Sequence, residues 1–138
     1  MFKRFAALFA VLIASFAIST SVSAKTNAFF GFLDWDAAAA QAAINNGERV
    51  AINIWADWCP NCTSQRRSLS DLIKSDPEAY GDVKVFAIEY DDPNRPAAVG
   101  SHPIPNSSAR TTIIFFGGGQ ELAVYGGQSP FEMAEILM

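Results

Sequence analysis

The sequence predicts a single small α/β domain built on a mixed β-sheet. Its 138 residues leave room for one domain, and half of them are hydrophobic, which is sufficient for a packed core. Signals for helices and strands alternate along the chain, as expected for an α/β fold. Near the C-terminus, two strand-like runs flank three consecutive glycines and predict a β-hairpin in the same sheet.

The first clear helix is followed closely by the first clear strand. The alanine-rich run Asp36–Asn45 predicts a helix that opens at its first residue or at Asp34. This helix is expected to stop before Gly47, because glycine can take the left-handed conformation that ends many helices. Val50–Trp55 is a short apolar run, typical of a strand that is covered on both faces.

The later signals predict a helix, a strand, a hairpin and a last helix. In chain order these are Pro60–Lys74, Val83–Tyr90, the hairpin of Thr111–Phe116 with Glu121–Tyr125, and Ser129–Leu137. The stretch 91–110 between them is rich in proline, and we expect it to be a loop with at most one short helix.

Charge and cysteine count exclude several classes of function. Ten basic and fourteen acidic residues give a net charge of −4 without a basic stripe, so no nucleic-acid partner is expected. Two cysteines and a single histidine, His102, cannot form a multi-disulfide scaffold or a closed four-ligand zinc site within one chain. No nucleotide or metal motif is present, so neither a cofactor nor a metal is expected. His102 itself is expected to be a solvated loop residue.

The N-terminus has the three regions of a secretory signal peptide. A basic start, Met1–Arg4, precedes an apolar run over Phe5–Ile18, and small residues lead up to Ala24. The alternative is a retained membrane anchor, but a run of about 14 residues is shorter than the roughly 20 that span a bilayer. We therefore expect residues 1–24 to be cleaved after Ala24, leaving residues 25–138 as an acidic domain that is periplasmic or otherwise exported.

A C-x-x-C motif lies where the strand over 50–55 meets the next helix. The spacing of Cys59 and Cys62 allows their sulfurs to bond across one helical turn. Cys59 faces unpaired backbone N–H groups and the positive end of the helix dipole, and both lower the pKa of its thiol. Cys62 lies one turn further in and suits a second, resolving role. Outside a reducing cytoplasm such a pair can cycle between dithiol and disulfide.

The junction reads Trp-Ala-Asp-Trp-Cys-Pro-Asn-Cys over residues 55–62, and Gly126 follows the hairpin before the last helix. In these features the chain resembles the thioredoxin family, in its exported bacterial branch, from about Phe32 to Leu137. The resemblance implies a thioredoxin fold, in which helices flank a central mixed β-sheet. It also implies thiol–disulfide exchange through a redox-active Cys59–Cys62 disulfide. Cys59 would then be the attacking cysteine, Cys62 the resolving one, and Trp58 an aromatic neighbour that shields the disulfide, with Pro60 and Asn61 between the cysteines.

Three places depart from the family pattern. The usual cis-proline before the hairpin corresponds to Thr111, or to Pro105 if the loop is threaded differently. A non-proline cis bond costs about 2.5–4 kcal/mol, which favours a trans peptide before Thr111. Asn53 stands where the family has a buried aspartate, and Ala87 where it often has the lysine partner, so both charges of that pair are missing. Thr63 follows the second cysteine, where lysine is frequent.

Several other arginine and aromatic side chains are expected to have structural roles. Arg66 and Arg67 are expected on the solvated side of the helix that carries the cysteines. Trp55 is expected in the core. The phenylalanines near position 30 (Phe29, Phe30 and Phe32) are expected to be core or docking residues.

A thiol–disulfide oxidoreductase is the preferred function, and two alternatives stay open. One is a metallochaperone that binds Cu(I) through Cys59 and Cys62, because thiolates are soft ligands. The other is a redox-inert interaction module whose disulfide is structural. For the preferred function we expect the reducing direction and a monomer. Its partners would be protein or peptide thiols and disulfides, and a membrane electron-donor protein is a further candidate.

Overall fold

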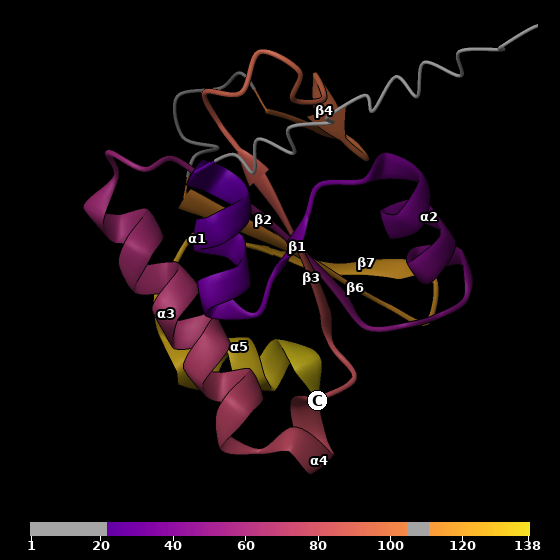
Figure 1. Ribbon diagram of the computed structural model, residues 1–138. Coiled ribbons are helices and arrows are strands. Elements are labelled where there is room, and N and C mark those ends of the chain that lie inside the picture. Colours follow the sequence, from indigo (N-terminus) through magenta and orange to yellow (C-terminus); the bar gives the residue numbers. More distant parts are fainter. Residues whose placement is uncertain (1–21, 105–110) are drawn as a thin grey trace, which may run out of the picture.

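The computed structural model describes residues 22–104 and 111–138, and a five-stranded mixed sheet forms its centre (Figure 1). The predicted α/β architecture, a central mixed sheet flanked by helices, is confirmed. Five helices and seven strands are described: α1 (Val22–Phe30), β1 (Leu33–Asp34), α2 (Ala37–Asn45), β2 (Val50–Trp55), α3 (Pro60–Ser75), α4 (Pro77–Tyr80), β3 (Lys84–Glu89), β4 (Ala98–Val99), β5 (His102–Pro103), β6 (Thr112–Gly117), β7 (Gln120–Tyr125) and α5 (Pro130–Leu137).

The central strand of the sheet is β2. The strand order is β1-β3-β2-β6-β7, in which β1, β3 and β2 are parallel and β6 and β7 are antiparallel to their neighbours. All six residues of β2 are buried, as the apolar run predicts. Side chains alternate along a strand, so Val50, Ile52 and Ile54 face one side of the sheet. Ala51, Asn53 and Trp55 face the other side.

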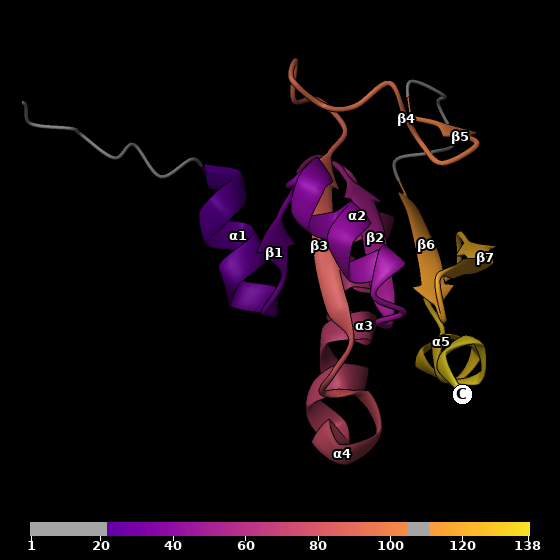
Figure 2. The same ribbon diagram turned by 90° about the vertical axis from the view of Figure 1, so that its right-hand side faces the viewer.

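Helices cover both faces of the sheet (Figures 1 and 2). On one face, α1, α3 and α5 enclose a core that includes Phe30, Trp55, Leu69, Phe115 and Met133. On the other face, α2 and the β4–β5 ribbon pack over a second apolar cluster. The N-terminus of α3 therefore lies close to the carboxyl end of β2, and both cysteines are at this junction.

Local capping explains why the predicted helices begin and end where they do. The Asp36 side chain accepts a hydrogen bond from the Ala39 N–H at 2.9 Å, and Ser129 accepts one from the Glu132 N–H at 3.4 Å. Gly47 has a φ of +76° and ends the α2 region in the left-handed conformation. The predicted helices near 36–45, 60–74 and 129–137, the two central strands and the hairpin are all confirmed within one or two residues.

Four features of the fold are not predicted from the sequence. These are α1, the short strand β1, the single-turn helix α4, and the β4–β5 ribbon where we expected a loop with at most one helix. β1 extends the sheet by pairing Leu33 with Phe86. The Ser70 hydroxyl donates to the Phe30 carbonyl at 2.8 Å and ties α1 to α3.

The predicted signal peptide lies almost wholly outside the described residues. Its expected cleavage point after Ala24 falls inside α1, and cleavage stays a prediction. None of the helices within 22–104 and 111–138 is long and apolar enough to span a bilayer.

The interpretation of Arg66 as a solvated residue is wrong, whereas its neighbour Arg67 is indeed exposed. Arg66 is 1% exposed, and its guanidinium lies 3.9 Å from the centroid of the Trp55 ring. The rings of Phe30 and Phe32 also lie against it, and its Nη2 donates to Asn27 on α1. The physical reason is the helix period, which places position 66 on the same face as Cys62 and Leu69.

Candidate active site

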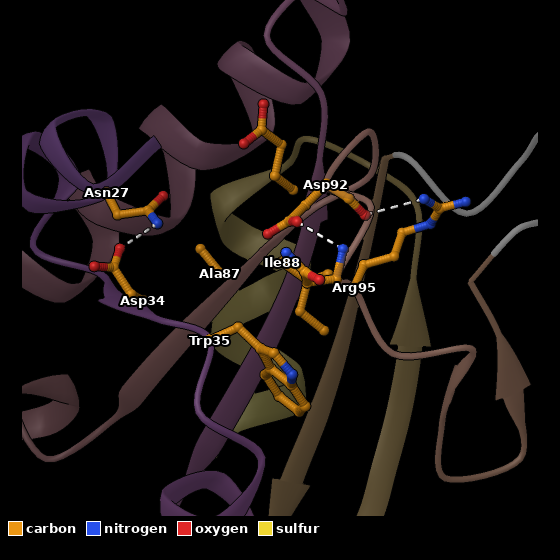
Figure 3. Close-up of a pocket in the computed structure, with 9 residues that line it drawn as sticks. Asn27, Asp34, Trp35, Ala87, Ile88, Asp92 and Arg95 are labelled. Atoms are coloured by element: carbon orange, nitrogen blue, oxygen red, sulfur yellow. Dashed lines mark hydrogen bonds between the residues drawn. The ribbon is translucent and has the colours of Figure 1, made fainter. Parts of the chain in front are cut away.

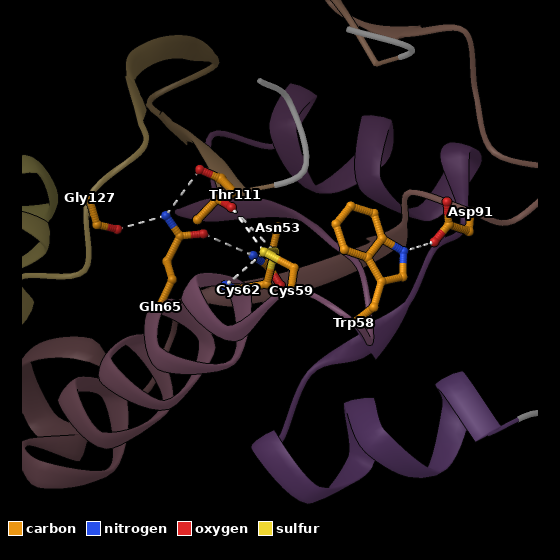
Figure 4. The surroundings of a disulfide bond; sticks show 8 residues. All are labelled: Asn53, Trp58, Cys59, Cys62, Gln65, Asp91, Thr111 and Gly127. Carbon is orange, nitrogen blue, oxygen red and sulfur yellow. Dashed lines mark hydrogen bonds between the residues drawn. A yellow bond between two sulfur atoms is a disulfide. The ribbon is translucent and has the colours of Figure 1, made fainter. Parts of the chain in front are cut away.

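Cys59 and Cys62 form a disulfide at the junction of β2 and α3 (Figure 4). Cys59 is the N-cap of α3, and its sulfur accepts a hydrogen bond from the Cys62 N–H at 3.3 Å. Pro60 occupies the first turn of α3, where its missing N–H costs no hydrogen bond. Cys62 is fully enclosed, whereas Cys59 is 6% exposed, so Cys59 is the less deeply buried of the two cysteines.

Thr111 lies directly against the disulfide. Its hydroxyl oxygen is 3.3 Å from the sulfur of Cys59 and 3.3 Å from the sulfur of Cys62. The sequence comparison with the family pattern also predicts Thr111 at this position, just before the hairpin. Pro105 and the peptide bond before Thr111 lie outside the described residues.

Two buried amides lie behind the cysteines. Asn53 is fully buried on β2, between Ala87 on β3 and Ile113 on β6, and its Nδ2 donates to Gln65 Oε1 at 3.5 Å. The Nε2 of Gln65 in turn donates to the Gly127 carbonyl at 2.7 Å. The two amides therefore bond to each other and to a backbone carbonyl. This agrees with the sequence, in which Asn53 and Ala87 replace the aspartate and lysine of the family pattern.

Gln65 is the site residue that sequence reasoning missed. It is fully buried on α3, and besides Gly127 its Nε2 reaches the Thr111 carbonyl at 3.5 Å. It thus connects the helix of the cysteines with the start of β6 and with the loop before α5. A polar residue three positions after Cys62, on the buried face of the helix, is the signal that could have indicated it.

Trp58 and Asn61 form the exposed side of the motif. Trp58 is 56% exposed, and its indole N–H donates to the Asp91 carboxylate after β3. This bond fixes the ring beside the cysteines (Figure 4), where a shielding role was expected. Asn61 is exposed between the two cysteines. The surface next to Cys59 is therefore aromatic and exposed.

The other predicted candidates lie elsewhere. His102 is half-buried on β5, and its Nε2 lies within hydrogen-bond distance of Glu121 on β7 at 2.9 Å, so it is a tethered strand residue rather than a freely solvated loop residue. A polar pocket of about 260 Å³ is lined by Asn27, Trp35 and Asp92 among others, and neither cysteine lines it (Figure 3). Within the described part of the chain, no group of three or more His, Cys, Asp or Glu side chains is placed to hold a metal ion.

Acidic residues surround the end of β3 near Trp58. Burial raises the pKa of Glu89, and repulsion from Asp57, Asp92 and Asp91 raises it further, while Arg66 opposes the shift. The side of the site next to Trp58 is consequently negative, whereas the Thr111 hydroxyl and the Cys62 N–H, which contact the sulfurs, are neutral.

The fold and the site define a class of protein: a thioredoxin-fold domain with a disulfide at the N-terminus of the helix that follows the central strand. Comparisons with known proteins agree with this class, although no family model matches the chain. The thiol:disulfide interchange protein DsbE of Vibrio cholerae is 30% identical over 93 residues, which cover 64% of this chain and 46% of that protein. The chain thus spans less than half the length of this relative.

Two further relatives match over most of their length. A thioredoxin of Pyropia yezoensis is 32% identical over 97 residues, covering 69% of this chain and 81% of that protein. The crystal structure of Trxlp from Edwardsiella tarda superposes with a TM-score of 0.62 at 30% identity, covering 76% of this chain and 96% of that one. The chain belongs to the thioredoxin family.

Proposed function

We propose that this chain is an exported thiol–disulfide oxidoreductase that reduces protein or peptide disulfides through Cys59 and Cys62. The observation that carries the proposal is the asymmetry of the pair. Cys59 keeps 6% of its surface exposed and its sulfur caps the N-terminus of α3, while Cys62 is fully enclosed one turn further on. A helix N-terminus favours a thiolate, and a thiolate is the attacking species in disulfide exchange.

The reaction consists of two balanced exchanges. The Cys59 thiolate attacks a client disulfide, forms a mixed disulfide with one client sulfur, and displaces the other client sulfur as a thiolate. Cys62, as a thiolate, then attacks the Cys59 sulfur, so that the Cys59–Cys62 bond forms and the second client thiolate leaves. Two electrons pass from the cysteine pair to the client, and the displaced thiolates take up protons from solvent.

Export and partners belong to the same proposal. The basic start, apolar run and small residues over 1–24 support a signal peptide, and the name of the Vibrio cholerae relative supports exchange between thiols and disulfides. We propose a monomer that acts on protein thiols and disulfides and takes electrons from a membrane donor. N-terminal sequencing of the exported protein tests cleavage after Ala24 directly.

A trapping experiment tests the function. Cys62→Ser removes the resolving thiol, so the mixed disulfide on Cys59 should accumulate and its partners can be named by mass spectrometry. Cys59→Ser should form no adduct, and Thr63→Ala, an exposed neighbour, should behave as wild type. A membrane donor among the trapped partners supports the reducing direction, whereas secreted folding clients would overturn it.

The reduction potential separates exchange from a permanent disulfide. A structural bond lies below about −300 mV and resists the glutathione pool. A value that low, together with no turnover of insulin disulfides by the wild-type protein, would contradict the proposed function.

A further inference from the structure

The Thr111 hydroxyl occupies an unusual place, because it is within 3.3 Å of both sulfurs of one disulfide. In the disulfide neither sulfur carries a hydrogen, so the hydroxyl can only be a donor, and its one hydrogen can point to either sulfur. Disulfide sulfur is a weak acceptor, and the hydroxyl therefore gains little in the oxidised state. A thiolate at either sulfur position would be a charged acceptor, and charge-assisted hydrogen bonds are roughly twice as strong.

We propose that Thr111 is a catalytic residue whose hydroxyl donates to whichever active-site sulfur carries the negative charge. This inference rests on the proposed thiol–disulfide exchange. In the reduced protein the hydroxyl would donate to the Cys59 thiolate before it attacks a client. In the second exchange it would donate to the Cys62 thiolate until that sulfur bonds to Cys59. The hydroxyl keeps its own proton throughout, so no further acid, base or oxidant is required.

The surrounding structure holds Thr111 in this position from its backbone side. Gln65 on α3 links the Thr111 carbonyl and the Gly127 carbonyl, so the residue is held between α3 and the loop before α5. The hydroxyl can rotate between the two sulfurs without moving the backbone, because both lie at the same distance from it.

The Thr111 hydroxyl is a neutral group in contact with both sulfurs, whereas the acidic residues of the site lie around the end of β3 near Trp58. Asn53 and Gln65, which come from β2 and α3, are neutral. Among the charged groups of the neighbouring segments, Arg66 lies against Trp55, Asp91 accepts from Trp58, and Glu89 lies at the end of β3, where burial and the nearby aspartates raise its pKa. Asp57 lies exposed in the turn before the cysteines. A single neutral donor at the sulfurs should consequently have a measurable effect.

Three variants test the proposal in the full mature protein. Thr111→Val removes the hydroxyl and keeps the branched shape, Thr111→Ser keeps the hydroxyl, and Thr63→Val makes the same exchange at an exposed position one residue after Cys62. The ultraviolet absorbance of the thiolate gives the Cys59 pKa as pH is varied. The equilibrium with glutathione gives the stability of the dithiol relative to the disulfide.

We expect Thr111→Val to raise the Cys59 pKa by about one pH unit, since it removes a hydrogen bond to a charged group. At a pH where the thiolate predominates, the same loss should move the glutathione equilibrium about tenfold towards the disulfide. Thr111→Ser and Thr63→Val should both stay close to wild type. Urea unfolding of the oxidised proteins shows whether each variant is folded.

The proposal is overturned if folded Thr111→Val titrates like wild type, or if Thr63→Val shifts the pKa as much as Thr111→Val does. Should Thr111→Val fail to fold, Thr111→Ala replaces it and the same two outcomes decide. Failure of the proposed function would look different: the wild-type protein would not exchange disulfides with clients, while the effect of Thr111→Val on the thiol pKa would be unchanged.

Discussion

Replacing the buried arginine of α3 tests what holds the helical layer together. Arg66 is enclosed by three aromatic rings, and its Nη2 donates to Asn27. Its Nε and Nη1 have no hydrogen-bond partner among the described residues. Burial lowers the pKa of Arg66 to about 10, with Glu89 opposing the shift, so the guanidinium is still charged at neutral pH.

The favourable and unfavourable contributions of this cation are similar in size. A desolvated cation–π contact is worth about 2 kcal/mol. The hydrogen bond of a charged donor to Asn27 adds about 1.5–3 kcal/mol. Against them, each of the two unpaired N–H groups costs about 1–3 kcal/mol. Arg66→Met keeps an apolar side chain packed at this position. It removes both the favourable contacts of the guanidinium and its unpaired N–H groups, so the free energy of unfolding should lie within about 1 kcal/mol of wild type.

Truncation should behave differently from replacement by methionine. Arg66→Ala leaves a cavity beside Trp55 and should lower the free energy of unfolding by about 3 kcal/mol. Arg67→Met changes the exposed neighbour on the same helix and should have little effect. Urea unfolding of the oxidised proteins, followed by tryptophan fluorescence, measures all three. If Arg66→Met loses as much stability as Arg66→Ala, the charge itself stabilises the core and the reasoning is refuted.

Three further predictions concern the site and the sheet. Asn53→Asp should raise the Cys59 pKa, add a second ionisation to the pH–rate profile, and lower the free energy of unfolding by about 2 kcal/mol, because the new carboxylate has no cationic partner. An unchanged thiolate titration in the folded variant would show that Asn53 does not act on the sulfurs. With a limiting alkylating agent, the reduced protein should be modified at Cys59 before Cys62, as peptide mapping would reveal; the reverse order contradicts the assignment. Hydrogen bonding to Arg49 lowers the pKa of Asp82, so the pair stabilises the fold above the usual carboxyl pKa and loses this effect as pH falls through the lowered value. Arg49→Gln should therefore reduce the acid-induced loss of stability between neutral pH and about pH 3, measured by urea unfolding.

The sequence predicts elements well where the signal is local. Asp36, Gly47 and Ser129 act within one helical turn of their own position, and the boundaries they predict are confirmed. The apolar run of β2 is likewise confirmed to the residue. By contrast, β1 is two residues long and is stabilised by pairing with β3, more than fifty residues later, so no local pattern indicates it.

The same distinction separates the predicted from the missed parts of the site. Cys59 and Cys62 are indicated by a motif of four residues and a helix start. The contact that makes Gln65 part of the site is with Gly127, 62 positions away. For Arg66 two sequence signals conflict. The helical period of α3 places it on the buried face, whereas its charge favours an exposed position. Its aromatic neighbours, two of them from the segment before β1, compensate for burial of the charge.

The two departures from the family pattern nearest the sulfurs act in the same direction. A buried aspartate at position 53 would add negative charge to the core behind Cys62 and raise the pKa of nearby thiols, and asparagine removes that effect. Thr111, where the family usually has proline, adds a hydroxyl donor 3.3 Å from each sulfur, and a donor lowers the pKa of the thiol it contacts. Both changes therefore favour the thiolate, one by removing a charge and the other by adding a hydrogen bond. Asn53→Asp and Thr111→Val should consequently raise the same pKa, but only the aspartate brings a second titrating group, so the shape of the titration separates the two causes.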